Sequence, residues 1–394
     1  MTAHLQTAAT ERPRILISGG LAVGGPQTHL TILCSVLAQS GAEVTVASAS
    51  TNWTPQAIAQ LKVQGVRVIV SPFGFGPLRF LAKLWTFLAW PFLLRRDYDV
   101  LCCIGEGKMH LWASRFVRKG GWKIYHELVE CPAPGSVAAQ VAGRMDAIVA
   151  NSSKVGEEIA ALWPDIPVRV IPFLTSHVPA NPPAPRGRVS QRELRIAFLG
   201  RLVPHKRPDR LIASWAAWNA CAPVGPARLD IYGGDYDREG VRLQKQIADL
   251  GLADTVCLRG VYATNDLRAI FDQADIVVLP SLYEGLPLVL VEAMQRGVPV
   301  VATSAGGTAE LGVDNADVIV TDGTSWTKFE AGLRDMAERV RSGKIDNVRL
   351  HEWTEARYGF ERVAGLWREA LLIPDDFFLP KAAPSRPAEM MGAG

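Results

Sequence analysis

The 394-residue chain has few cysteines and no long apolar run. Its six cysteines form no C-x-x-C pair, which is typical of neither a zinc site nor a disulfide framework. No uncharged apolar stretch reaches the length of about 18 residues that a membrane-spanning helix needs. Residues 1–13 hold no apolar segment like that of a secretory signal. We therefore expect a protein of a reducing, cytoplasmic compartment.

An excess of charge of one sign is also absent, since the net charge is only +3. Residues 1–190 hold 18 basic and 11 acidic residues, a net +7, whereas residues 191–394 hold 24 and 28, a net −4. This balance is not that of a general polyanion binder, and we expect no nucleic-acid partner. The hydrophobic share of 48% is that of a globular protein, and the unequal halves indicate two domains with different partners.

Short β-branched runs alternate with helical stretches along most of the chain, which predicts an α/β architecture with parallel sheets. The expected strands are 14–18, 43–48, 66–70, 100–104, 122–125 and 147–150, then 195–200, 228–232, 256–258, 276–279, 298–302 and 317–321. A proline-rich stretch at 179–188 separates the two series and predicts a linker.

The predicted organisation is therefore two Rossmann-like, doubly wound domains that face a central cleft, with ligands outside the carboxyl ends of the strands. The expected segments are 1–185 for the N-terminal domain, 186–351 for the C-terminal domain, 352–371 for a final helix and 372–394 for a loose tail.

The most informative segment follows the predicted strand at 276–279. Pro287 stands where a helix is expected to begin, and proline is favoured at the first helical position. Backbone amides there would form an anion site, which the helix dipole strengthens. The amides expected to take part are those of Gly285, Leu286 and Leu288. Glu284 precedes this site and Glu292 lies inside the helix, where their carboxylates suit pairs of sugar hydroxyls. The alternative is an acidic cap and an ordinary surface glutamate.

A second segment joins the strand at 195–200 to the next helix. Gly200 and Arg201 form a turn, and Lys206 follows five residues later. Arg201 and Lys206 have the chemistry to neutralise a pyrophosphate without a metal. Taken alone, the segment also fits a solvated basic loop.

Two weaker features lie in the first half. The loop Gly19–Gly25 resembles a dinucleotide-binding loop only loosely, and no acidic residue closes the following strand. A tight turn is the alternative. His126, followed by Glu127, ends a predicted strand, where α/β folds keep functional groups. A structural histidine is the alternative. The remaining histidines show no metal-binding spacing, and we expect no metal.

Together, these segments resemble glycosyltransferase family 4, the retaining enzymes of the GT-B fold, over about residues 14–370. The E-x7-E pattern of Glu284 and Glu292 is the strongest part of the resemblance. The other matching segments are Gly200 to Lys206, Ser304 to Glu310, Gly24-Gly25 with Gln27 to Leu30, and His126 with Glu127.

The resemblance implies a nucleoside-diphosphate sugar as donor, UDP- or GDP-linked, with no other cofactor. The acceptor would be a glycan or a lipid-linked glycan, in bacterial polysaccharide or lipopolysaccharide synthesis. Arg201 and Lys206 would hold the pyrophosphate next to Gly200. Glu292 would bind the ribose, and Glu284 would contact the donor sugar.

The resemblance also gives roles on the other side of the cleft. Gly24 and Gly25 would line its N-terminal side, and His126 would approach the anomeric centre. The helix at 352–371 would cross back to the N-terminal domain, with hinges at 179–188 and just before residue 352. One departure is Arg207, because many members have glycine after the lysine; we expect it to be tolerated.

Three rival functions account for these motifs less well than a glycosyltransferase does. They are a GT-B sugar-nucleotide epimerase, an inactive GT-B scaffold protein and a nicotinamide-dependent dehydrogenase.

Residues 78–96 raise a separate question, because four basic residues accompany apolar and aromatic ones with no acidic residue. Such a segment is typical of a helix at a membrane interface. The alternative is a buried helix that ends at Pro91.

Overall fold

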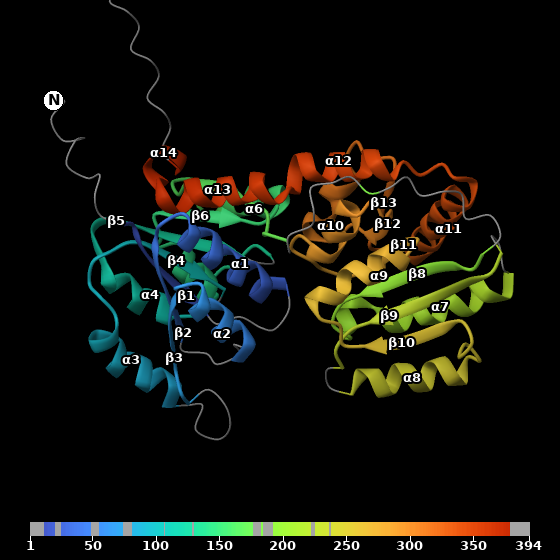
Figure 1. Cartoon of the computed structure of the whole chain (residues 1–394), viewed down its shortest axis with the longest axis horizontal. Coiled ribbons are helices and arrows are strands. Elements are labelled where there is room, and N and C mark those ends of the chain that lie inside the picture. The colour runs from blue at the N-terminus through green and yellow to red at the C-terminus, as the bar shows by residue number, and fades with distance from the viewer. Residues whose placement is uncertain are drawn as a thin grey trace, which may run out of the picture.

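The chain forms two parallel sheets, each covered by helices, in a computed structural model (Figure 1). The structure describes residues 12–19, 25–48, 55–73, 81–105, 107–127, 130–175, 183, 192–221, 225–235 and 238–378. The α/β prediction with two doubly wound sheets is confirmed. Gly24 and nearly all of the predicted linker at 179–188 lie outside the described residues.

The first sheet has the strand order β3-β2-β1-β4-β5-β6-β7. Its strands are β1 (Arg14–Gly19), β2 (Glu43–Ser48), β3 (Arg67–Val70), β4 (Tyr98–Ile104), β5 (Val117–Glu127), β6 (Ala147–Ala150) and β7 (Val168–Val170). Strand β7 was not predicted, because its three residues sit between prolines and include Arg169. The accompanying helices are α1 (Gly25–Gln39), α2 (Pro55–Val63), α3 (Leu81–Leu93), α4 (Met109–Ala113), α5 (Val137–Ala142) and α6 (Ser153–Leu162).

The second sheet repeats this winding, in the order β10-β9-β8-β11-β12-β13. Its strands are β8 (Leu194–Leu199), β9 (Ala227–Tyr232), β10 (Val256–Gly260), β11 (Ile276–Leu279), β12 (Val300–Thr303) and β13 (Val318–Thr321). Around it lie α7 (Pro208–Cys221), α8 (Glu239–Asp249), α9 (Leu267–Gln273), α10 (Leu288–Gln295) and α11 (Trp326–Ser342). In each sheet the first strand is followed by strands added on one side, and the later strands are added on its other side. Such a reversal of strand order opens a crevice at the carboxyl edge.

The sequence forms these strands because both faces of each sheet are buried. In β1, Ile15 and Ile17 pack into one apolar cluster, whereas Leu16 packs into the cluster on the opposite face. The second sheet has its own cluster, which includes Phe198 and Trp215. The near-continuous apolar runs of the sequence therefore become buried parallel strands.

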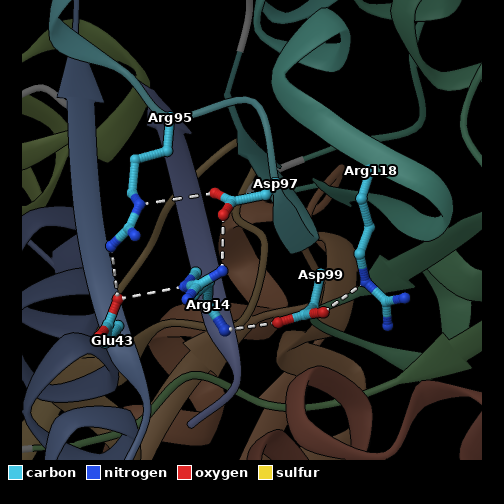
Figure 2. Close-up of polar contacts among 6 residues, drawn as sticks. All are labelled: Arg14, Glu43, Arg95, Asp97, Asp99 and Arg118. Atoms are coloured by element: carbon cyan, nitrogen blue, oxygen red, sulfur yellow. Dashed lines mark hydrogen bonds and ion pairs between the residues drawn. The ribbon is translucent and has the colours of Figure 1, made fainter. Parts of the chain in front are cut away.

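The amino edge of the first sheet is closed by ion pairs (Figure 2). Arg14 joins Asp97 at 2.6 Å and Glu43 at 3.4 Å, and its backbone N–H donates to Asp99 at 2.7 Å. Arg95 joins Glu43 at 3.4 Å, just after α3. These opposite charges are therefore paired with one another at the edge opposite to the carboxyl ends of the strands.

The C-terminal segment corrects one prediction. Residues 352–371 do not form a single helix: α12 (Asn347–Tyr358) and α13 (Phe360–Leu372) meet at Gly359, whose φ of −58° and ψ of 142° are extended. His351 of α12 donates through Nδ1 to the carbonyl of Gln295 at 2.6 Å, on the second-sheet side. Trp367 of α13 donates to the carbonyl of Pro172 at 3.1 Å, on the first-sheet side. The crossing between the two halves therefore takes place at Gly359.

The prediction of a loose tail from residue 372 is wrong for its first part. Helix α14 (Pro374–Phe378) docks on the first sheet, where Asp375 accepts a hydrogen bond from Trp122 at 2.8 Å. Phe378 stacks on the same indole, with ring centroids 5.5 Å apart. Residues 379–394 lie outside the described part of the chain.

Candidate active site

The predicted site residues of the second half gather at the carboxyl edge of the second sheet. Gly200 follows β8, Glu284 lies in the loop after β11, and Gly306 follows β12. Strands β8 and β11 are neighbours at the point where the strand order reverses. The fold therefore places three loops from separate parts of the sequence around one crevice.

Lys206 and Glu284 form an ion pair at the centre of this edge. Lys206 ends η3 (Pro204–Lys206), a short 3-10 helix. The side chain of Lys206 is only 14% exposed and that of Glu284 only 11%. Gly200 lies beside the stem of Lys206: a Cβ there would be 3.9 Å from the lysine Cδ. A backbone hydrogen bond of 2.8 Å from Leu282 to His205 ties the two loops together. The basic segment therefore packs against the Glu284 loop, and Lys206 is not the solvated side chain that the loop alternative implies.

Helix α10 begins one residue later than predicted. Pro287 is the N-cap, not the first helical residue, and its carbonyl accepts from the amides of Leu290 and Val291 at 3.1 and 3.4 Å. The side chains of Leu286 and Leu288 are buried in apolar clusters, so only their backbones can face a ligand. The positive end of this eight-residue helix lies directly after the Glu284 loop.

Glu292 lies in the second turn of α10 and is buried. Burial and the negative charge of Glu292, in that order, raise the pKa of Tyr262 above its usual range. Tyr262 is therefore neutral and lies close to the carboxylate. The alternative of an ordinary surface glutamate is wrong.

The double glycine of the Ser304–Glu310 segment has a steric reason. Gly306 adopts a φ of +54°, and a Cβ on it would stand 1.7 Å from the carbonyl oxygen of Glu284. Gly307 donates its N–H to the carbonyl of Gly285 at 2.7 Å. The loop after β12 thus supports the Glu284 turn by direct backbone contact, which any side chain would prevent.

Glu310, which the sequence identified only as part of a matching segment, links the loop after β12 to the first half of the chain. Its carboxylate accepts from the N–H groups of Ser153 at 2.6 Å and Lys154 at 3.3 Å, at the N-terminus of α6. Burial raises the pKa of Glu310, and these hydrogen bonds oppose the shift. A carboxylate at a helix N-terminus is stabilising, so this contact holds the two halves together beside the site.

The first half also approaches the site through Gly25. This residue is the first of α1, and a Cβ on it would lie 3.2 Å from Cδ1 of Leu288. The N-termini of α1 and α10 therefore meet at the same place. Both helix dipoles present their positive ends there.

Arg201 lies near the lysine but is exposed. The pKa of His205 is lowered mainly by burial and next by the positive charge of Lys206. The negative charge of Glu284 opposes this shift, and the charge of Arg201 lowers the pKa by a smaller amount. The four side chains are therefore electrostatic neighbours. His205 also stacks on Tyr283, with ring centroids 4.4 Å apart, which places an aromatic pair next in sequence to Lys206 and Glu284.

Arg207 occupies the position at which the family resemblance leads one to expect glycine. It adopts the left-handed conformation, with a φ of 58°, which favours glycine. Its buried guanidinium stacks 4.9 Å over the ring of Trp326 and donates to the carbonyl of Gly323 at 3.3 Å. These contacts offset the backbone strain and fix the turn next to Lys206.

His126 ends β5 as predicted, but its ring is fully buried. It packs against Trp367 and His29, at centroid distances of 4.6 and 5.2 Å. Among the described residues, neither ring nitrogen has a hydrogen-bond partner and no contact joins the ring to the ion pair. Glu127 does not orient it, because this carboxylate accepts from the hydroxyl of Tyr125 at 3.0 Å on the other face of the strand. Contact of His126 with a donor sugar stays a prediction that needs the ring to be uncovered.

Neither a metal cluster nor a membrane-spanning helix is found in the described part of the chain. It contains no group of three or more His, Cys, Asp or Glu side chains placed to hold a metal ion. None of its helices has the length and apolar character needed to cross a bilayer.

The two halves of the chain each match a model of a glycosyltransferase family. The family model described as "Glycosyltransferase Family 4" matches residues 23–173, and the one described as "Glycosyl transferases group 1" matches residues 185–342. A D-inositol 3-phosphate glycosyltransferase of Paenarthrobacter aurescens is 32% identical over 186 residues, which are 45% of each chain. The chain thus spans about half the length of the curated relatives it matches.

Solved structures resemble the fold over almost the whole chain. HepE of Anabaena in complex with UDP and glucose has a TM-score of 0.71 at 21% identity, and the match covers 92% of this chain and 100% of that one. Sucrose-phosphate synthase of Thermosynechococcus elongatus has a TM-score of 0.69 at 17% identity, with coverages of 93% and 99%. The two family models match both halves of the chain and the neighbours share both sheets, so the chain belongs to glycosyltransferase family 4, a family of transferases with the GT-B fold.

Proposed function

We propose that the protein transfers a hexose from a nucleoside-diphosphate sugar to a glycan or lipid-linked glycan, with retention of the anomeric configuration. The observation that carries this proposal is the nearly buried pair of Lys206 and Glu284, which lies at the N-terminus of α10 beside the buried Glu292. A cation and a helix dipole suit a diphosphate, and the two carboxylates suit the hydroxyls of a ribose and a hexose.

The chemistry of the departing group gives each residue a role. When the bond between the anomeric carbon and the diphosphate breaks, negative charge grows on the diphosphate oxygens. Lys206 and Arg201 stabilise that charge from fixed positions, which lowers the barrier. Glu292 holds the ribose and Glu284 the transferred sugar. The leaving diphosphate then accepts the proton of the attacking acceptor hydroxyl on the same face of the sugar.

UDP is the donor nucleotide that we favour over GDP. HepE, whose fold this chain shares, was solved with UDP and with UDP-glucose. The partly buried, neutral Tyr262 near Glu292 would offer a flat surface next to the proposed ribose position. We propose no metal requirement, because two basic side chains and a helix dipole already face the diphosphate position.

The acceptor has two candidate classes. The basic first half and the segment 78–96 favour a glycan anchored in the cytoplasmic face of a membrane, as in polysaccharide or lipopolysaccharide synthesis. The names of the relatives, which include D-inositol 3-phosphate glycosyltransferase and sucrose-phosphate synthase, favour a phosphorylated polyol or sugar instead. Both classes belong in the acceptor screen.

Calorimetric titration with UDP, GDP and ADP tests the donor assignment. We expect UDP to bind most tightly and Glu292→Ala to weaken binding by about tenfold to a hundredfold, because it removes a charge-assisted contact to the ribose. Glu338→Ala, at an exposed glutamate of α11, is the matched control and leaves binding unchanged. Equal weakening in both variants, or no binding of any nucleotide, contradicts the site.

Turnover is measured next, with UDP-hexoses and both acceptor classes, and the product configuration is read by NMR. Transfer with retention supports the proposal. Release of an epimerised sugar nucleotide without any acceptor identifies the epimerase alternative. Tight binding of UDP without turnover on any acceptor favours the inactive scaffold.

A further inference from the structure

Helix α3 is apolar on both of its faces, although it lies at the outside of the first half (Figure 1). One face, formed by Ala82, Thr86 and Trp90, is buried against the sheet. The opposite face carries an exposed stripe at helical spacing: Leu84 (54% exposed), Phe87 (53%), Leu88 (56%) and Phe92 (89%). The alternative of a buried helix that ends at Pro91 is therefore wrong, because the helix continues to Leu93 and its outer face is exposed.

Helices α8 and α11, which also lie at the surface, carry ion pairs on their outer faces instead of such a stripe. The outer face of α8 carries Arg242 and Lys245, and that of α11 carries Asp335 and Arg339, all in ion pairs. A helix that is apolar all round is normally enclosed by protein or by lipid. The exposed face of α3 therefore lacks a covering partner among the described residues.

The stripe is bordered by basic side chains. Phe87 stacks on Trp112 of α4 with centroids 4.7 Å apart, and the guanidinium of Arg115 lies 5.0 Å over that indole. Lys83 and Arg96, at the two ends of α3, are exposed. Within the described part of the chain, no ion pair joins Lys83, Arg96 or Arg115 to a carboxylate. The surface thus combines an apolar centre with a positive rim that forms no ion pair with any carboxylate of the described residues.

The geometry points to a docking surface for an anionic lipid bilayer, made by the α3 stripe (Leu84, Phe87, Leu88 and Phe92) and its basic rim (Lys83, Arg96 and Arg115). Apolar side chains enter the boundary between headgroups and acyl chains, and the basic rim pairs with the anionic headgroups. A second copy of the chain fits less well, because a symmetric contact would bring two positive rims together. The 13-residue helix is about 20 Å long, which suits a position along the surface.

The topology connects this surface to the active-site edge. Strand β3 ends at Val70 on the carboxyl edge of the first sheet, and α3 runs back from there to the amino edge. Arg95, just after α3, is held at that amino edge by Glu43 (Figure 2). The stripe therefore begins on the side of the sheet that faces the candidate site, so a docked bilayer can present an acceptor there. This inference goes beyond the proposed reaction, since docking needs neither donor nor turnover.

Vesicle co-sedimentation of the full chain tests the docking surface. We expect sedimentation with vesicles that contain phosphatidylglycerol, little with pure phosphatidylcholine, and release at high salt because screening weakens the basic rim. The double variant Leu88→Glu/Phe92→Glu should lower the partition coefficient by about tenfold or more, since it places charge where apolar groups would enter the bilayer. Lys83→Glu/Arg96→Glu should lower it by about tenfold through the loss of headgroup pairing.

Matched controls lie on the second half of the chain. Val241→Glu changes a valine of α8 that is 67% exposed, and Lys344→Glu reverses an exposed charge. Both should sediment as the unchanged protein does. Equal loss in the α3 variants and the controls, or no sedimentation of the unchanged chain at low salt, overturns the inference.

Two further measurements distinguish bilayer docking from self-association and from a perturbed fold. Gel filtration without lipid tests for self-association: a dimer that Leu88→Glu/Phe92→Glu dissolves assigns the stripe to a second copy and overturns the bilayer. Calorimetric UDP binding is unchanged in the same variant if the surface acts only in docking. Loss of UDP binding together with docking would show that the variant perturbs the fold, and Lys83→Glu/Arg96→Glu then decides the question.

Discussion

The ion pair of Lys206 and Glu284 allows a quantitative test of how the site is built. Its side chains are 14% and 11% exposed, whereas those of the comparable pair of Lys245 and Asp249 are 75% and 59% exposed. Removing one partner of a nearly buried pair leaves an uncompensated charge, which costs about 3–5 kcal/mol of unfolding free energy. Removing one partner of an exposed pair costs at most about 0.5 kcal/mol.

We therefore expect Lys206→Ala to destabilise the protein by about 3 kcal/mol, and Lys245→Ala to change its stability by less than about 0.5 kcal/mol. The double variant Lys206→Met/Glu284→Gln should recover at least about half of the loss, because it removes both charges and keeps a similar volume. Urea unfolding followed by circular dichroism and tryptophan fluorescence measures all three. Coincidence of the two signals justifies treating the transition as a single step.

Turnover gives a second reading of the same variants. Lys206→Ala should lower kcat by about a hundredfold to a thousandfold, as the loss of one preorganised group that stabilises transition-state charge does. The double variant should stay inactive although its stability recovers. Equal stability of Lys206→Ala and Lys245→Ala would refute the buried-pair reasoning, and normal turnover of the double variant would refute the role of the pair in catalysis.

Three further predictions follow from the packing, the titration and the strain of single residues. Gly306→Ala should abolish UDP binding in calorimetry, because a Cβ would stand 1.7 Å from the carbonyl oxygen of Glu284. Gly251→Ala is the control, since Gly251 has a similar φ of +65° but open space around it. This control should cost only about 1 kcal/mol in urea unfolding and leave UDP binding intact. Burial lowers the pKa of His110 to about 4, so its stabilising contribution is complete above about pH 6.5 and is lost as the pH falls towards 4. His110→Gln should therefore reduce the slope of the unfolding free energy against pH in that range by about 1.4 kcal/mol per pH unit. An unchanged slope would contradict a buried neutral ring. Arg207→Gly should leave stability within about 1 kcal/mol, since relief of strain offsets the lost stacking, yet raise the KM for the donor; an unchanged KM would show that the turn beside the lysine does not need the arginine.

The sequence was informative wherever one element or one local pattern decides the outcome. The β-branched runs predicted nearly all strands, because a strand buried on both faces needs continuous apolar residues. The segment from Gly200 to Lys206 and the E-x7-E pattern singled out two loops that the structure brings together at the carboxyl edge of the second sheet. That was possible because a strand, a turn and a helix start lie within a few residues of one another, so the backbone keeps their functional groups together.

Predictions failed where the outcome depends on what packs from elsewhere. The spacing of residues 352–371 is helical throughout, but Gly359 ends one helix and begins another because each half packs on a different sheet. His126 stands at the expected end of its strand, yet Trp367, from far along the chain, covers its ring. Periodicity cannot report a partner that is distant in sequence.

The sequence by itself thus determined the fold class, the two-part organisation and the identity of the loops that meet at the carboxyl edge of the second sheet. Only the tertiary structure decided that Lys206 and Glu284, 78 residues apart, are paired and nearly buried, that Glu310 binds the N-terminus of α6, and that the outer face of α3 is left uncovered. The physical reason is that local patterns specify backbone elements, whereas burial, ion pairing and exposure depend on which elements the fold brings together.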